Sequence, residues 1–316
     1  MMAVSDGHGS PKCVRSEVGS RLAVKVAIDC VDRFFDGSSA EDKRFAEDKR
    51  RFENDFPSDL VTSWREAVSN HARENPLTEA DYDRVNQGAG AQAVAALREA
   101  AEKGAGTALF LAYGATILLV VVADSGIFYA QLGDGDILAV SAASEVESPL
   151  PEDASLIANE TTSLCMRDAV RQFRFGFHHR EKEPPALILV STDGYANAFA
   201  SPQDFHKVGT DVLRMIQESG LPTEVEIAPW LEAASSLGSG DDVTLGILCR
   251  AENVDLGRPA PSATLVPPIE EAGTETVQES FSPSDHDKEV AVVQALAVPG
   301  EPRPDELTVA KGPLDE

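Results

Sequence analysis

Four turns in this chain carry aspartate, and three of them follow directly after an apolar run. They contain Asp6-Gly7, Gly133-Asp134-Gly135, Asp193-Gly194 and Asp241-Asp242. A strand that ends in such a turn carries a carboxylate beyond the sheet edge, and a neighbouring glycine lets the backbone approach whatever that carboxylate holds. Several such turns together would form the all-oxygen site that hard divalent cations prefer. Taken singly, each turn needs no ligand, because Asp-Gly pairs are common turn dipeptides.

Other motifs that could carry chemistry are weaker. Gly88 begins GAGAQA, which loosely matches a dinucleotide-binding fingerprint but follows a polar segment rather than a strand. The sequence contains neither a phosphate-binding P-loop nor an HExxH zinc motif. His178 and His179 lie in a polar connection before a strand, which favours a surface loop over a metal site. The four cysteines form no CxxC pair, so neither a zinc cluster nor a disulfide framework is predicted.

Size and charge limit the classes of partner. The chain has 316 residues, 42% of them hydrophobic, which is enough for one large core or two small ones. A net charge of −26 argues against nucleic acid or an anionic membrane as the main partner. The N-terminus lacks a charged segment followed by an apolar one, so we expect a cytoplasmic protein.

The elements that must position the aspartates are predicted by hydrophobic periodicity. Helices are predicted over residues 16–35, 59–74, 89–103, 203–218 and 227–237, with a solvated helical excursion in the charged tract between the first two. Strands are predicted over residues 108–122, 126–132, 136–140, 186–190 and 243–249. The apolar run Leu109–Ala123 is shorter than the roughly 20 residues that a membrane helix needs and is interpreted as part of a buried hairpin. Short turns between strands predict antiparallel pairing, with helices outside, in an α+β fold.

The composition changes near Ala251. Residues 252–316 hold 14 acidic and 4 basic side chains and nine of the nineteen prolines. This composition predicts a folded domain over residues 1–250 and an acidic, proline-rich disordered tail over 251–316. The apolar patch Val290–Val298 inside the tail is either a short docking segment or a stretch without a role.

The ordered set of turns resembles the metal-dependent protein serine/threonine phosphatases of the protein phosphatase 2C (PPM) family. The sequence around Asp193 resembles the bacterial branch of that family more than its eukaryotic members. The matching residues are Asp6-Gly7-His8-Gly9, Gly133-Asp134-Gly135, Ser191-Thr192-Asp193-Gly194 and Asp241-Asp242-Val243-Thr244. The resemblance covers most of residues 3–249. It implies an α/β/β/α four-layer sandwich, in which two antiparallel sheets are flanked by helices.

The resemblance also implies roles for single residues. Asp6 would bridge two Mn²⁺ or Mg²⁺ ions, and the carbonyl of Gly7 would complete one of them. Asp193 and Asp241 would ligate the other ion, while Asp134, with Asp193, matches the position of a weaker third metal. His8 is a candidate general acid for the leaving oxygen, the alternative being a side chain that caps the turn.

The implied reaction is hydrolysis of phosphoserine or phosphothreonine in proteins by water activated between two metal ions. Hard dications keep several waters, so few protein ligands suffice and no protein nucleophile is needed. The implied partners are phosphorylated proteins and the serine/threonine kinase that modifies them. A monomer is expected, with neither nucleic acid nor a membrane as partner.

The resemblance breaks at the N-terminus. Family members carry one or two strands, a phosphate-binding arginine and an acidic ligand before the Asp-Gly-His turn, whereas five residues precede Asp6 here. We therefore expect the first strand or strands to be missing. Either the start codon was assigned too far downstream, which we favour because the later acidic positions are intact, or the protein is a degenerate relative. The alternative function is then a weak or inactive module that binds phosphoproteins or kinases. Asp242 also stands where the family usually has asparagine.

Overall fold

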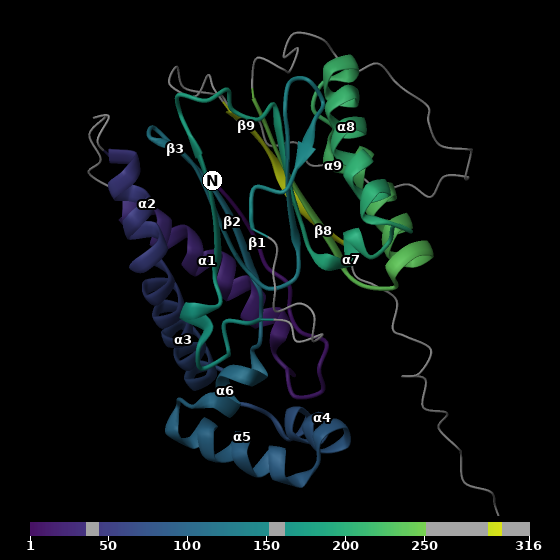
Figure 1. Cartoon of the computed structure of the whole chain (residues 1–316). Helices are drawn as coiled ribbons and strands as arrows, with labels where there is room; N and C mark the ends of the chain where they lie inside the picture. Colours follow the sequence, from purple (N-terminus) through teal and green to yellow (C-terminus); the bar gives the residue numbers. More distant parts are fainter. Residues whose placement is uncertain (36–43, 152–161, 251–289, 299–316) are drawn as a thin grey trace, which may run out of the picture.

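Two antiparallel sheets lie face to face between two layers of helices (Figure 1). This computed structural model describes residues 1–35, 44–151 and 162–250 and the backbone of 290–298. The first sheet has the order β1 (Met2–Val4), β2 (Ile117–Ala123), β3 (Gly126–Leu132) and β6 (Arg174–His179). The second has the order β5 (Val146–Glu147), β4 (Asp136–Val140), β7 (Leu187–Ser191), β8 (Val243–Arg250) and β9 (Val290–Val298). The predicted α+β class and four-layer architecture are confirmed.

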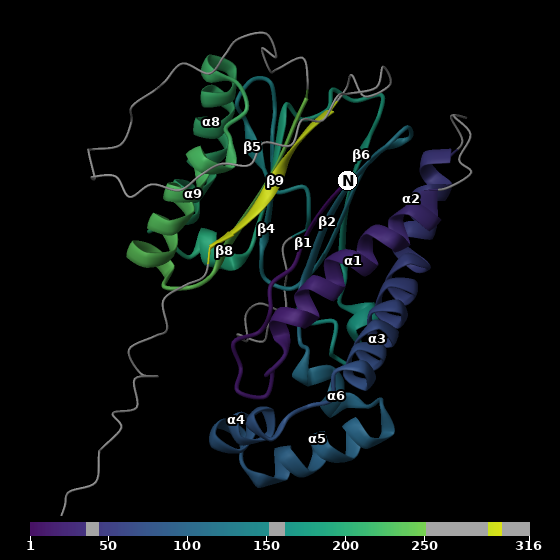
Figure 2. The same ribbon diagram turned by 180° about the vertical axis from the view of Figure 1, so that it is seen from behind.

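The two helical layers come from different parts of the chain (Figures 1 and 2). The first sheet is covered by α1 (Ser16–Phe35), α2 (Arg44–Asn54) and α3 (Phe56–Glu74). The second sheet is covered by α8 (Pro202–Ser219) and α9 (Glu224–Ala233). The helical hairpin of α4 (Glu79–Ala89) and α5 (Ala91–Lys103) lies at one end, followed by α6 (Thr107–Ala112). Shorter elements are the 3-10 turn η2 (Ala169–Arg171), α7 (Asp193–Ala196) and the π-helix η3 (Ala234–Ser239).

Strand β2 joins the layers because both of its faces are buried. Leu119 and Val121 belong to the core beneath the helices α1 to α3, whereas Leu118 and Val120 belong to the core between the sheets. A strand buried on both faces appears in sequence as a continuous apolar run. The core between the sheets contains Met2, Val4, Leu118, Val120, Ile127, Tyr129, Ile137, Leu150, Ile188, Val190 and Leu248.

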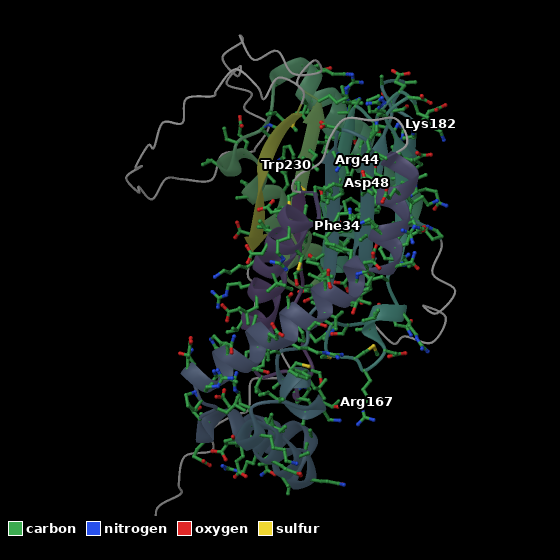
Figure 3. The ribbon with its side chains drawn as sticks, turned by 90° about the vertical axis from the view of Figure 1, so that its left-hand side faces the viewer. Phe34, Arg44, Asp48, Arg167, Lys182 and Trp230 are labelled. Atoms are coloured by element: carbon green, nitrogen blue, oxygen red, sulfur yellow. The ribbon has the colours of Figure 1, made fainter. Side chains whose placement is uncertain are left out.

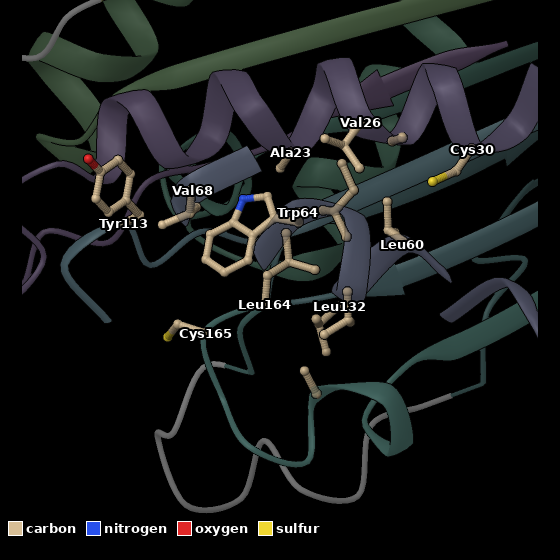
Figure 4. Close-up of a cluster of buried hydrophobic side chains, with 14 of the residues drawn as sticks. Ala23, Val26, Cys30, Leu60, Trp64, Val68, Tyr113, Leu132, Leu164 and Cys165 are labelled. Carbon is tan, nitrogen blue, oxygen red and sulfur yellow. The ribbon is translucent and has the colours of Figure 1, made fainter. Parts of the chain in front are cut away.

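The first helical layer is organised around Trp64 of α3. Its side chain is fully buried, and its indole N–H donates to the carbonyl oxygen of Gly19 at 3.0 Å (Figure 4). A buried tryptophan needs such a partner, because an unpaired N–H in an apolar core is costly. All four cysteines of the chain are free and buried, and Figure 4 shows Cys30 and Cys165 in this core.

Two predictions in the middle of the chain are wrong. The apolar run Leu109–Ala123 does not begin as a strand: Leu109–Ala112 belongs to α6, and β2 begins at Ile117. Its first part is rich in alanine and leucine, which favour helix, and β-branched residues dominate only later. His178 and His179 lie in strand β6 rather than in a surface loop. The alternating Phe175 and Phe177, which pack against the helix-side core, are typical of that strand.

The two ends of the described chain also differ from expectation. Strand β1 leads directly into Asp6, so the strand immediately before the first turn is present rather than missing. Strand β9 falls inside the predicted disordered tail, yet its backbone pairs antiparallel with β8. The rest of the tail lies outside the described residues, and the boundary at residue 250 stays a prediction. Within the described residues, no helix combines the length and apolarity needed to span a bilayer.

Candidate functional site

The first predicted turn is held in place by the start of β2. Strand β1 pairs Val4 with Leu118, and the isolated bridge between Gly7 and Ala115 continues the same register. Within this extension, the backbone N–H of Asp6 donates to Oγ1 of Thr116 at 2.9 Å. The N–H of Thr116 donates back to the carbonyl oxygen of Asp6 at 2.9 Å. These two bonds fix the backbone of Asp6 in the same way that strand pairing fixes a residue of β1.

The second turn lies between β3 and β4. The buried amide of Gln131 donates to the carbonyl oxygens of Gly133 and Gly135, which closes the turn around Asp134. Gly133 has φ +120°, a conformation that side-chain-bearing residues rarely adopt. Gly133 is thus required by the backbone path, and Asp134 is half-buried in the turn that follows it.

The third and fourth turns are tied to each other. Asp193 is the first residue of α7, directly after β7, and Asp241 comes just before β8. The hydroxyl of Thr192 accepts from the N–H of Thr244 at 3.0 Å and donates to the carbonyl oxygen of Asp242 at 3.4 Å. These bonds extend the pairing of β7 and β8 to the two aspartates.

Close glycine contacts bring the four turns together. A Cβ on Gly133 would lie 2.5 Å from Thr116, which binds Asp6. A Cβ on Gly135 would lie 2.4 Å from the carbonyl oxygen of Ser191, and one on Gly194 would lie 2.4 Å from that of Asp242. Such distances are too short for a real Cβ, so the second turn packs against Thr116 and the third turn, and the third turn packs against the fourth.

The carboxylates at this end of the sheets disfavour each other's charge. Burial raises the pKa of Asp6 to about 7, and the charges of Asp193, Asp241 and Asp134 add to the rise. Burial likewise raises the pKa of Asp193 to about 6, together with Asp134 and Asp241. Like charges that are partly removed from water repel each other strongly. The predicted residues Asp6, Asp134, Asp193 and Asp241 therefore form one acidic cluster.

This cluster has the chemistry of a hard-cation site. Its donors are carboxylate oxygens with the Gly7 carbonyl nearby, which suits Mg²⁺ or Mn²⁺ better than softer metals. Within the described ranges, no three His, Cys, Asp or Glu side chains already meet at metal-ligand spacing. The donor set fits a divalent cation, and occupation of the site stays a prediction.

His8 lies beside the cluster. Its backbone N–H donates to the carbonyl oxygen of Gly114 at 3.1 Å, and a Cβ on Gly114 would lie 2.7 Å from the imidazole Cδ2. Burial lowers the pKa of His8, and the charge of Asp134 opposes this shift. A general acid must carry its proton at the working pH, so the lowered pKa reduces the fraction of competent imidazolium. The acid role of His8 stays a prediction.

Sequence reasoning missed Asp136 and Arg174. Burial raises the pKa of Asp136 to about 6, the charge of Arg174 lowers it, and Asp193 and Asp134 raise it further. Arg174 also donates to the carbonyl oxygens of Pro151 at 3.2 Å and Gly133 at 3.5 Å. Asp136 follows Asp134 by two residues, which was the available signal. Arg174 comes from β6 and is distant in sequence, so only the fold identifies it.

Two other features belong to the scaffold. Gly88, in the loose dinucleotide motif, lies in α4, where a Cβ would come within 2.1 Å of Pro11. A cavity of about 610 Å³ lies at the opposite end of β2 and β3, next to Arg44, Asp48 and Ser125. Arg44 and Ser125 both donate to the buried Asp48 there, at 3.2 and 3.0 Å. Arg44 and Asp48 are labelled in Figure 3. These three groups are hydrogen-bonded to one another. The cavity lies away from the acidic turns and is not part of the acidic site.

Comparison with solved structures finds distant similarity. The chain is similar to a bacterial serine phosphatase, with 13% identity over 78% of this chain and 83% of that chain and a TM-score of 0.42. It is similar to the Mycobacterium tuberculosis serine/threonine phosphatase PstP/Ppp, with 10% identity over 78% of this chain and 84% of that chain and a TM-score of 0.38. It is also similar to PppA, a regulatory component of T6SS in Pseudomonas aeruginosa, with 14% identity over 65% of this chain and 70% of that chain and a TM-score of 0.35.

No curated protein matches the chain in sequence. The family described as protein phosphatase 2C, however, matches residues 1–232, which contain the whole first sheet, strands β4, β5 and β7 of the second, and three of the four turns. That match extends over well more than half of the sequence. The chain belongs to the protein phosphatase 2C family.

Proposed function

We propose that this protein hydrolyses phosphoserine and phosphothreonine in other proteins, using water activated by Mn²⁺ or Mg²⁺. The observation that carries the proposal is the convergence of Asp6, Asp134, Asp193 and Asp241 at one end of the sheets. Family membership supports the phosphatase activity, and the all-oxygen donor set supports the choice of cation.

Each of the acidic residues has its own part in holding the cations. Asp6 would help to hold both principal cations, and the Gly7 carbonyl would complete one of them. Asp193 and Asp241 would hold the other, and Asp134 together with Asp193 would hold a weaker third. When bound, these cations activate a water molecule for attack on phosphorus and neutralise the phosphoryl oxygens.

The remaining groups act on the substrate. His8 gives its proton to the departing serine or threonine oxygen. Because burial lowers the pKa of His8, this step is favoured when bound substrate phosphate stabilises the imidazolium. The substrates are phosphorylated proteins, and the opposing serine/threonine kinase is a further partner.

Hydrolysis of a phosphothreonine peptide tests the proposal. The full chain is assayed with Mn²⁺, with Mg²⁺ and with EDTA, beside the variant Asp193→Ala. We expect activity only with the cations and a loss of at least about a hundredfold in Asp193→Ala. Asp211→Ala, which removes an exposed carboxylate from α8, is the matched control and should retain full activity. Cation-independent hydrolysis, or equal rates in Asp193→Ala and the unmodified protein, would contradict the proposal.

A further inference from the structure

We propose that Gly238 is a positioning residue that sets the separation of Asp193 and Asp241. It lies in the π-helix η3 (Ala234–Ser239), which directly precedes the last acidic turn. The inference rests on the proposed function, since it treats these two aspartates as ligands of one cation. It adds a residue that has no polar side chain and therefore acts through backbone placement alone.

The π-helix has a defined end. The N–H of Gly240 donates to the carbonyl oxygen of Ser235 at 2.8 Å, which is the five-residue spacing of a π-turn. Gly240 then adopts φ +70°, in the left-handed region that favours glycine. Asp241 is the next residue. The direction in which Asp241 leaves the helix therefore depends on how this π-turn is packed.

The π-turn is packed against the segment that carries Asp193. A Cβ on Gly238 would lie 2.6 Å from the Cβ and 3.0 Å from the Cα of Ala198, so backbone would have to move to admit it. Ala198 is bonded into the end of α7, since its N–H donates to the carbonyl oxygen of Tyr195 at 3.2 Å. The N–H of Asn197 donates to the carbonyl oxygen of Asp193 at 2.9 Å. A displacement of Ala198 is thereby transmitted to Asp193.

A second close contact fixes the distance between the segments that carry Asp193 and Asp241. A Cβ on Gly194 would lie 2.4 Å from the carbonyl oxygen of Asp242 and 3.3 Å from the Cβ of Asp241. The two acidic segments therefore touch at two places, where Gly194 meets Asp241 and Asp242 and where Gly238 meets Ala198. Pushing them apart at one of these contacts tilts one carboxylate away from the other.

Manganese binding measures the effect without relying on catalysis. Free Mn²⁺ is followed by electron paramagnetic resonance during titration of the full chain. We expect Gly238→Ala to weaken Mn²⁺ binding by about tenfold or more, as loss of a ligand's supporting shell commonly does. Adding Ala198→Gly to Gly238→Ala removes the clashing Cβ and should restore most of the affinity. Ser236→Ala, in the same π-helix, removes only an exposed bond to Glu232 and should bind as the unmodified protein does.

Three results would overturn the inference: full affinity in Gly238→Ala, no recovery in the double variant, or an equal loss in Ser236→Ala. Ala198→Ser enlarges the same contact from the other side and carries the test if Gly238→Ala does not fold. Its expected result is also weaker binding, with the thermal midpoint in EDTA within a few degrees of the unmodified protein. A protein that binds Mn²⁺ but cleaves no phosphoester contradicts the proposed function alone, because this readout is cation occupancy.

Discussion

The backbone of Asp6 is held in place by the sheet, and the charge of its carboxylate is disfavoured by burial and by neighbouring carboxylates. Its backbone is bonded twice to Thr116, so the carboxylate cannot retreat far from Asp193 and Asp241. Its pKa of about 7 means that, without a cation, the folded protein carries this group as a mixture of acid and carboxylate near neutral pH. A divalent cation relieves the repulsion that maintains this state.

The raised pKa of Asp6 predicts how the cation-free protein responds to pH. The folded state holds the proton up to about pH 7, whereas the unfolded chain releases it near its ordinary value of 3.8. The folded state therefore binds more protons over this interval, so the free energy of unfolding falls as pH rises through it. In EDTA, the midpoint of thermal unfolding should decrease from pH 5.5 to pH 8. The free energy of unfolding should fall by at most a few kcal/mol over the same range. Mn²⁺ should raise the midpoint at pH 8.

Asp6→Asn is the decisive variant for that prediction. The amide cannot ionise, so the variant should lose most of the pH dependence and most of the stabilisation by Mn²⁺. Asp211→Asn, on the exposed face of α8, should keep both. A slope unchanged in Asp6→Asn would show that other groups cause it.

The turns themselves could be predicted, because Asp-Gly sequences after apolar runs are local signals. The fold places Asp6, Asp134, Asp193 and Asp241 at the same end of the two sheets, close enough for their charges to influence one another. The positions of Asp136 and Arg174 could not be assigned in the same way. Arg174 reaches the turn only because β6 pairs with β3 across a long connection, and no local pattern encodes that pairing.

At the scale of elements, Asp81 attaches the α4–α5 hairpin to the loop behind the first acidic turn. Its carboxylate accepts from Arg15 at 2.8 Å, from Arg84 at 2.8 Å and from the N–H of Thr78 at 2.9 Å. These bonds lower the pKa of Asp81 despite its burial, and they close the capping box that begins α4. Arg15 directly precedes α1, so its bond to Asp81 links the hairpin to that loop, beside the bond that Arg84 donates to the carbonyl oxygen of Val14 at 3.2 Å.

Removing this charge should detach the hairpin. Asp81→Asn leaves the largely buried guanidinium of Arg15 without its ion pair and weakens the cap, at a cost of about 3 kcal/mol. Urea unfolding followed by circular dichroism measures the loss. Asp83→Asn, two residues along the same helix and exposed, should change stability by less than about 0.5 kcal/mol. Equal losses in the two variants would contradict the role of Asp81.

The elements that sequence predicted well are those with long periodic faces. α1 has the predicted bounds, because its buried positions recur every three or four residues over twenty residues. α4 was missed although Thr78 and Asp81 form its capping box, since its apolar positions are few. The π-helix before Asp241 could not be predicted, because the packing of Gly238 against Ala198 rather than any residue pattern accompanies it.

At the scale of the whole molecule, the described cores belong to residues 2–249. Strand β9 pairs antiparallel with β8 at the edge of the second sheet. A chain that ends at residue 250 should therefore fold and keep its Mn²⁺-dependent thermal shift. It would also leave the edge of β8 unpaired, and such edges promote self-association.

Analytical ultracentrifugation of the shortened and full chains tests both parts. We expect the full chain to sediment as a monomer and the shortened chain to show concentration-dependent association. Restoring residues 251–298 should abolish that association. Unfolding of the shortened chain would contradict the domain boundary, and identical sedimentation of the two chains would contradict the protective role of β9.

Because all four free cysteines are buried, the surface of this fold presents no reactive thiol. Burial raises the pKa of Cys13 and of Cys249 to about 11, so little of either is present as the reactive thiolate at neutral pH. A maleimide dye would consequently react first with a cysteine introduced on the outside, without prior removal of the native ones. Fluorophores could then be attached beside the acidic turns and on the distant helical hairpin, so that energy transfer between them would follow the motion of these parts in solution.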